Sequence, residues 1–140
     1  MKTRLSIALL IAVSTLSSTA SAADLIVKVT GIRDHKGTLS LAVYDSAESW
    51  DNDGKPIAGD RRTPDADEVT FRFGELLAGT YAVQAMHDAN GNGKLDSNFM
   101  GMPTEGYGFS NNPKVMRKAH FDEAAVKVGD EPVTITLKLR

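Results

Sequence analysis

Cysteine is absent from the 140-residue sequence, and aromatic residues make up only 6% of it. Without cysteine the chain has no disulfide bridge, thiolate metal site or cysteine nucleophile, so a hydrophobic core has to stabilise its fold. No Gly-x-Ser-x-Gly, Walker, Rossmann or His-Glu-x-x-His pattern occurs, and His35, His87 and His120 lack the spacing of a zinc site. We therefore expect a non-enzymatic protein. The alternative is a hydrolase whose site has no recognisable sequence pattern.

Long apolar runs are also missing, except near the N-terminus. Residues 5–13 are apolar apart from Ser6, follow two basic residues and precede the small residues Ala20-Ser21-Ala22. This order is typical of a secretory signal peptide, and the run is well short of the roughly 20 residues of a membrane-spanning helix. The sequence predicts a signal peptide over residues 1–22, a mature domain over residues 23–140 and a periplasmic or secreted location.

Neither sign of charge dominates. The sequence has 16 Lys and Arg against 18 Asp and Glu, and loss of Lys2 and Arg4 with the signal peptide leaves 14 against 18, a net charge of −4. The remaining 140 − 22 = 118 residues are enough for one domain. A weakly acidic surface does not attract nucleic acid or anionic lipid, so we expect neither as a partner and no membrane span.

Period-two alternation is the main structural signal in the mature chain. It occurs in residues 25–29, 39–43, 69–73, 81–85 and 133–139, with a shorter apolar run at 124–128. Turns are expected at residues 31–37 and 129–132, and only SAESW and FDEAA suit a helical turn. The pattern predicts an all-β fold: a single immunoglobulin-like or prealbumin-like antiparallel β-sandwich of about seven strands, or a small barrel. The expected core residues are Leu41, Val43, Phe71, Phe73, Tyr81, Val83, Ile135 and Leu137.

The spacing of Leu77, Gly79 and Tyr81 at the start of one strand resembles a tyrosine corner. In that motif the tyrosine hydroxyl bonds back to nearby backbone. A plain core tyrosine after a glycine turn is the alternative.

Residues 87–98, HDANGNGKLDSN, match most of a calcium-loop template. The predicted metal ligands are Asp88, Asn90, Asn92, the backbone carbonyl of Lys94, and Asp96. Ca²⁺ takes about six to eight oxygen ligands, and glycines at 91 and 93 permit the sharp curl that brings such ligands together. An Asn-Gly turn joining two strands without a metal is the alternative.

The twelfth loop position holds Phe99 instead of the usual glutamate. A missing ligand could come from Asn98, Glu105, Asp51 or Asp53. With only two local carboxylates we expect weak affinity for Ca²⁺, with Kd about 10⁻⁴ to 10⁻³ M.

Residues 105–113, EGYGFSNNP, offer a second candidate site. Tyr107 and Phe109 could stack on a carbohydrate or peptide, with Asn111 supplying hydrogen bonds and Trp50 an exposed anchor. The alternative is structural: the aromatics close one end of the sandwich, the asparagines satisfy loop backbone, and Trp50 packs in a small satellite cluster.

Residues 79–113 contain GTY, HDANGNGKLD and EGYGFSNN in that order. This order resembles a bacterial family known as domain of unknown function 2141, over the whole mature chain. More distantly, the strand-then-loop pattern resembles prealbumin-like and Cna-B-like modules, some of which bind Ca²⁺ in such loops. The resemblance implies a small secreted β-sandwich and brings no established activity. From the candidate sites we expect an unidentified protein or carbohydrate as partner.

The signal peptide gives a first testable prediction. Exported protein should begin at Ala23, or at Asp24 if cleavage follows Ala23, because residues 20–22 fit the small-residue recognition pattern. N-terminal sequencing of periplasmic protein measures this, and an intact Met1 terminus there would be the contrary result.

Overall fold

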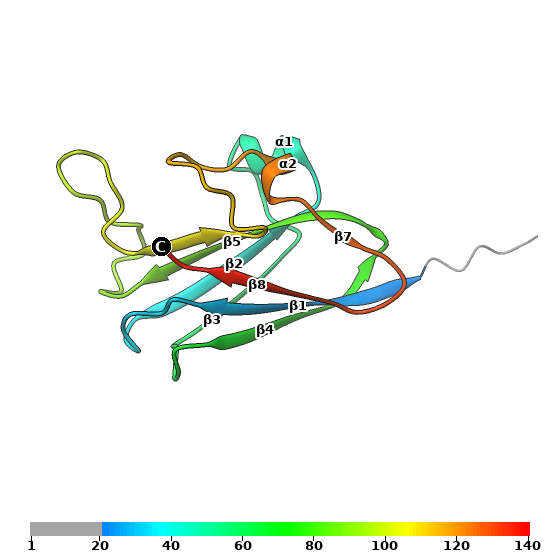
Figure 1. Cartoon of the computed structure of the whole chain (residues 1–140), viewed down its shortest axis with the longest axis horizontal. Helices are drawn as coiled ribbons and strands as arrows, with labels where there is room; N and C mark the ends of the chain where they lie inside the picture. Colours follow the sequence, from blue (N-terminus) through cyan, green and yellow to red (C-terminus); the bar gives the residue numbers. More distant parts are fainter. Residues whose placement is uncertain (1–20) are drawn as a thin grey trace, which may run out of the picture.

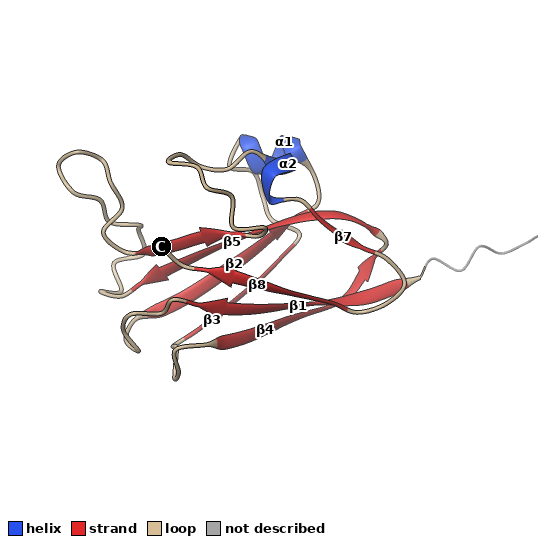
Figure 2. Cartoon of the chain, viewed as in Figure 1, coloured by secondary structure: helices blue, strands red, loops and turns tan. Residues whose placement is uncertain are grey.

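The computed structural model describes residues 21–140. Residues 1–20, which hold most of the predicted signal peptide, lie outside the described part. The elements in chain order are β1 (Ala22–Thr30), β2 (Thr38–Tyr44), α1 (Ala47–Asp51), β3 (Ala58–Arg62), β4 (Val69–Leu77), β5 (Gly79–Asp88), β6 (Gly106–Phe109), α2 (Phe121–Ala124), β7 (Val126–Val128) and β8 (Val133–Lys138). The predicted all-β class is therefore confirmed, with eight strands in the described part (Figures 1 and 2).

The strands form the two sheets of a sandwich. One sheet has the order β4-β1-β8, and the other has the order β3-β2-β5-β6, with β7 paired to β5. All of these pairs are antiparallel except β1 with β8, which run parallel and so depart from the antiparallel expectation. The reason lies in the turn at residues 129–132. It joins β7 in one sheet to β8 in the other, so these two strands do not form a hairpin.

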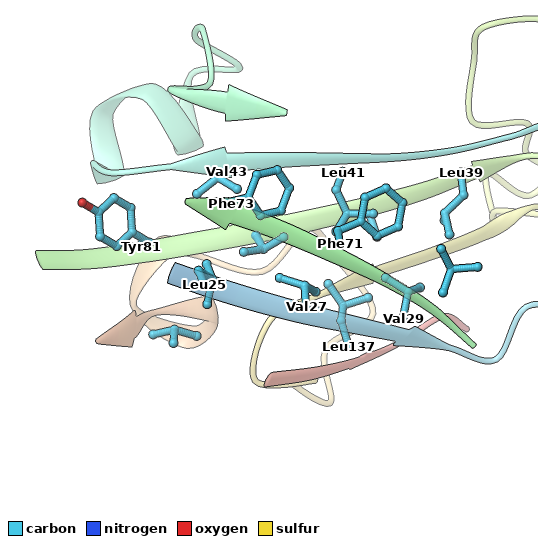
Figure 3. Close-up of a cluster of buried hydrophobic side chains, with 14 of the residues drawn as sticks. Leu25, Val27, Val29, Leu39, Leu41, Val43, Phe71, Phe73, Tyr81 and Leu137 are labelled. Carbon is cyan, nitrogen blue, oxygen red and sulfur yellow. The ribbon is translucent and has the colours of Figure 1, made fainter. Parts of the chain in front are cut away.

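The main core lies between the two sheets, where alternate residues of each strand point inward (Figure 3). Seven of the eight expected core residues are buried there, and Ile135 packs against them from a half-buried position. Phe71 and Leu137 are fully buried. The alternation in the sequence therefore identified the buried face of each long strand correctly.

A second, smaller cluster covers part of the outer face of the five-stranded sheet. Its buried members are Tyr44, Trp50, Ala82, Phe109, Ala119 and Ala124. The helices α1 and α2 lie together on this side of the molecule (Figure 2). The two helical turns expected from SAESW and FDEAA are thus confirmed, and they shield the outer face near one end of the sheet.

Two strands lack a clear signal in the sequence. β3 has the sequence AGDRR at an edge of its sheet, and β6 has the sequence GYGF with glycine at every second position. A Cβ on Gly108 would stand 2.7 Å from the backbone oxygen of Lys138. Glycine is therefore needed at this position by the close approach of β6 to β8, a tertiary contact that local propensity does not reveal.

Tyr81 makes the contact expected of a tyrosine corner. Its hydroxyl donates to the backbone oxygen of Leu77 at 2.7 Å. Burial, with a smaller effect of Asp45, raises the pKa of this hydroxyl above its usual value. The neutral phenol that the hydrogen bond needs is therefore the favoured form.

The packing of Phe71 gives a second prediction. Phe71→Ala should reduce the free energy of unfolding by about 3–5 kcal/mol, because it removes a fully buried ring from the main core. Chemical denaturation measures this. Thr70→Ala, at the exposed neighbouring position of the same strand, is the matched control and should change stability by less than about 1 kcal/mol. Equal effects of the two substitutions would contradict the assignment of the buried face.

Candidate functional site

Asp88, the last residue of β5, organises the loop that follows it. Its side chain is buried, and one carboxylate oxygen accepts backbone N–H groups from Gly91 at 2.8 Å and Asn92 at 3.1 Å. The other oxygen accepts the N–H of Gly93 at 2.7 Å. Gly91 and Gly93 both have positive φ, so the chain can curl round this one carboxylate. The loop is therefore wound round the Asp88 carboxylate.

Asn90 and Asn92 repeat one local motif and then converge on Asp96. The side-chain oxygen of Asn90 accepts the N–H of Asn92 at 3.0 Å, and that of Asn92 accepts the N–H of Lys94 at 2.9 Å. Both side-chain amides donate to the Asp96 carboxylate, with Asn92 at 2.8 and 3.0 Å from its two oxygens. Three predicted ligand side chains thus meet at one point, while Lys94 joins the network through its backbone.

Glu105 connects the loop to the strand that follows it. One of its carboxylate oxygens accepts the backbone N–H of Ala89 at 3.0 Å, and the other accepts that of Asp96 at 3.0 Å. The side chain therefore holds the beginning and the end of the loop together. The sequence suggested Glu105 only as one of several possible additional metal ligands. Nothing in the EGYG segment indicates that its carboxylate accepts the backbone N–H of Asp96, nine residues earlier in the chain.

Of the other proposed sources of a ligand, Asn98 and Asp53 are engaged away from the loop centre, and Asp51 is an exposed residue at the end of α1. The Asn98 side-chain oxygen accepts the N–H groups of Met100 and Met102, and Asp53 pairs with Lys118 at 2.6 Å. Phe99 is 96% exposed at the tip of the segment. Of the candidates discussed, Glu105 is the one placed against the loop, where backbone N–H groups already engage both of its oxygens.

Chemically, the loop presents hard oxygen donors of low charge. Two carboxylates, two amide oxygens and nearby backbone carbonyls form a donor set suited to Ca²⁺ and poorly suited to zinc or copper. Within residues 21–140, no three His, Cys, Asp or Glu side chains gather closely enough to form a metal-ligand cluster of that kind. A cation at this loop would therefore depend on the asparagines and on backbone oxygens.

The histidines are spread over separate structures. The His35 ring bonds to Asp67 at 2.9 Å, and the His87 ring bonds to the backbone oxygen of Lys36 at 2.8 Å. His120 is the N-cap residue of α2. In each case the local contacts belong to a turn, a strand end or a helix cap.

The segment 105–113 has mainly a structural role, in which its aromatic rings pack on the sheet and its asparagines bond to backbone. Phe109 is buried in the smaller cluster, whereas Tyr107 is half-buried beside it, with ring centroids 5.9 Å apart. The Asn111 side chain donates to the backbone oxygen of Ala125. Asn112 exchanges side-chain hydrogen bonds with the backbone of β8, at 2.7 and 2.8 Å. Only Tyr107 keeps a partly accessible ring.

Trp50 is not an exposed anchor. It has no exposed surface, and its indole N–H donates to the backbone oxygen of Ala119 at 2.7 Å. The rings of Tyr44 and Phe109 contact it edge-on at 5.3 and 5.8 Å. The expectation of a ligand contact is wrong for this residue because the long connection after β2 folds back over the sheet and encloses the ring.

A hollow of about 440 Å³ lies beside the loop, over the outer face of β5 and β6. Its lining is Asp53, Gln84, Ala85, Met86, Leu95, Gly101, Pro103, Tyr107, Phe109, Met116, Arg117 and Lys118. The loop after β5 and the segment before α2 both rise on this side of the molecule (Figure 1). The hollow is thus bounded by the two longest irregular segments of the structure.

Ion pairs fix one wall of this hollow. Arg117 donates to both carboxylate oxygens of Glu123 at 2.7 and 2.9 Å, and the backbone N–H of His120 donates to the same carboxylate. The Arg117 guanidinium is the main reason that the pKa of Glu123 falls to about 2, and the His120 N–H adds to the effect. Lys118 pairs with Asp53 and also donates to the backbone oxygen of Trp50 at 2.6 Å. The charges of this wall are therefore mostly neutralised.

Comparison with known proteins identifies the family. The family model described as uncharacterised proteins conserved in bacteria, domain of unknown function 2141, matches residues 27–136. The chain belongs to this family. No curated protein and no solved structure matches the chain, so the likeness to prealbumin-like and Cna-B-like modules stays a prediction. In residues 21–140 we find no helix with the length and apolar character needed to span a bilayer.

The role of Asp88 gives a third prediction. Asp88→Ala should speed hydrogen exchange at the N–H groups of Gly91, Asn92 and Gly93 by about tenfold or more, because each loses a charged acceptor. Amide exchange measured by NMR in metal-free buffer tests this. Asp130→Ala, in the exposed turn before β8, is the control and should leave these amides unchanged. Unaltered exchange in Asp88→Ala would show that other contacts hold the loop.

Proposed function

We propose that this family member is an exported, non-enzymatic β-sandwich protein whose loop at residues 88–96 binds Ca²⁺. The observation that carries the proposal is the convergence of Asn90, Asn92 and Asp96 inside a loop wound round Asp88. A simple turn between β5 and β6 does not need three polar side chains that meet at one point inside a loop wound round a fourth. The loop also lies at an open end of the sandwich, where an ion has access from solvent (Figure 1).

The chemistry of the loop favours Ca²⁺ over Mg²⁺. Ca²⁺ accepts irregular sets of oxygen ligands, whereas Mg²⁺ demands a tight octahedron and keeps its waters. Ca²⁺ would compete with the two asparagine N–H groups for the Asp96 carboxylate, and the Lys94 carbonyl would be a backbone ligand. Because Asp88 and Glu105 already accept backbone N–H groups, their remaining capacity is limited. These features support a weak site, with Kd about 10⁻⁴ to 10⁻³ M.

Export is supported by the order of basic, apolar and small residues over residues 1–22. β1 starts at Ala22, and Ala23 is buried and paired with Leu76. Cleavage after Ala22 would leave the Ala23 pairing intact. In the periplasm or outside the cell, Ca²⁺ concentrations suit a weak loop better than cytosolic ones do.

The biological role that we propose is structural or in recognition, with a protein or a carbohydrate as partner. The sequence contains no Gly-x-Ser-x-Gly, Walker, Rossmann or His-Glu-x-x-His pattern, and the description of the family names no activity. Loops at one end of a rigid sandwich commonly carry binding functions, because the sheets fix their position.

Calcium binding gives the fourth prediction. Wild-type protein should melt at a higher temperature in Ca²⁺ on the order of 10 mM than in chelator, because a ligand at ten times its Kd stabilises the folded state by about 1.4 kcal/mol. Mg²⁺ at the same concentration should have a smaller effect. Thermal denaturation followed by circular dichroism measures both.

Asp96→Asn is the test variant, because it keeps the size of the side chain and removes one of the loop's two carboxylates. It should lose most of the Ca²⁺-dependent shift. Asp130→Asn removes one carboxylate from an exposed turn elsewhere and should respond to Ca²⁺ as the wild type does. Identical melting of wild-type protein in chelator and in Ca²⁺ would reduce the loop to an Asn-Gly-rich turn.

A further inference from the structure

Met116 lies between two hollows whose linings differ in charge. It is 80% exposed, and it lines both the hollow of about 440 Å³ over β5 and β6 and a second one of about 590 Å³ beside β8. We call these two hollows, together with the side chain that separates them, the Met116 surface. A single exposed apolar side chain needs no explanation, but exposed apolar side chains gathered around a hollow mark a candidate binding surface.

The first hollow is the apolar half of this surface. Leu95, Met86, Tyr107 and Phe109 contribute to its lining, and its charged wall residues Arg117 and Lys118 are paired with Glu123 and Asp53. Phe99, Met100 and Met102 are also exposed, on the segment that supplies Leu95, Gly101 and Pro103 to the hollow. Methionine side chains are flexible and polarisable, so they adapt to apolar groups of varied shape.

The second hollow is the basic half. Its lining is Arg33, Asn112, Lys114, Met116, Lys138, Leu139 and Arg140, which includes four cationic side chains and no acidic one. Within residues 21–140, Arg33, Lys114 and Lys138 form no ion pair. The whole chain has a net charge of −2, so this positive region is opposite in sign to the molecule as a whole. It is therefore suited to attract an acidic group locally.

We propose that the Met116 surface docks an extended segment of another protein in which apolar side chains are flanked by acidic ones. The apolar side chains would enter the hollow over β5 and β6, and the acidic ones would face Arg33, Lys114 and Lys138. Charge complementarity selects the acidic flank, and the adjacent apolar hollow selects the neighbouring side chains.

An extended polypeptide fits this geometry better than a lipid tail. Both hollows open to solvent along the surface, and they are joined side by side at Met116 instead of forming one enclosed cavity. An open groove leaves a long alkyl chain partly in water, whereas a peptide can place its apolar side chains in one hollow and its acidic flank at the next, and keep its backbone hydrated. None of the five predicted calcium ligands, at positions 88, 90, 92, 94 and 96, lines either hollow, so the docking proposal goes beyond the calcium proposal.

The probe is a fluorescein-labelled synthetic peptide with a central run of leucines flanked by glutamates. Fluorescence anisotropy with the mature protein, in chelator and at low salt, should rise to saturation. Affinity should fall as salt is added, since the lysine and arginine charges are exposed. Two further peptides, one with lysine for glutamate and one with serine for leucine, should each bind at least about tenfold more weakly.

Matched variants locate the binding. Met116→Ser and the double variant Lys114→Glu/Lys138→Glu should each weaken binding by about tenfold. Leu77→Ser and the double variant Lys28→Glu/Lys127→Glu replace exposed side chains outside the Met116 surface, the second with the same change in net charge, and should stay within about twofold of wild type. All these side chains are exposed, so each variant should keep the wild-type circular dichroism spectrum.

Three outcomes would overturn the proposal. The first is saturable peptide binding that none of the Met116-surface variants weakens, and the second is no binding of the leucine–glutamate peptide at all. The third is Met116-dependent sedimentation with phosphatidylglycerol vesicles in the absence of peptide binding, which would assign the surface to lipid. Because the assay runs in chelator, neither result bears on calcium binding by residues 88–96.

Discussion

Burial of β5 on both of its faces is the constraint on which the rest of the structure depends. Its inward residues, such as Tyr81 and Val83, belong to the main core, while Ala82 on the opposite face belongs to the smaller cluster with Trp50. A strand of a two-layer sandwich normally has one wet face. In this molecule the connection through α1 and the segment leading into α2 cover part of that face, so β5 is held from two sides.

This double burial fixes the position of the loop. β5 stays buried up to His87 and Asp88, so the carboxylate that winds the loop is anchored to the most constrained strand. Gly37 contributes from the other side: a Cβ there would lie 2.0 Å from the backbone oxygen of Asp88, and its φ is +68°. The turn between β1 and β2 can therefore lie directly against the start of the loop. Oxygen ligands that a rigid strand end already holds in place lose less conformational freedom on binding an ion than flexible ones do.

The loop at residues 88–96 and the Met116 surface are held by the same strands, but different side chains would bind the ion and the peptide. Glu105 closes the loop and begins the short connection into β6, whose Tyr107 lines the apolar hollow. The exposed tip around Phe99 lies between them in sequence, beyond the loop that Asp88 and Glu105 hold.

The sequence alone determined the strand pattern, the buried faces, the tyrosine corner and the local winding of residues 88–96, because these depend on side-chain periodicity and on neighbours within a few residues. Only the tertiary structure decided the rest. It enclosed Trp50 by folding a distant segment over the sheet, paired β1 with β8 in parallel, made strands of AGDRR and GYGF, and brought Glu105 onto the loop. It also placed Arg33 beside Lys114 and Lys138. Each of these contacts joins residues far apart in sequence or depends on the packing of one sheet against the other, and neither the spacing nor the propensity of the residues concerned encodes it.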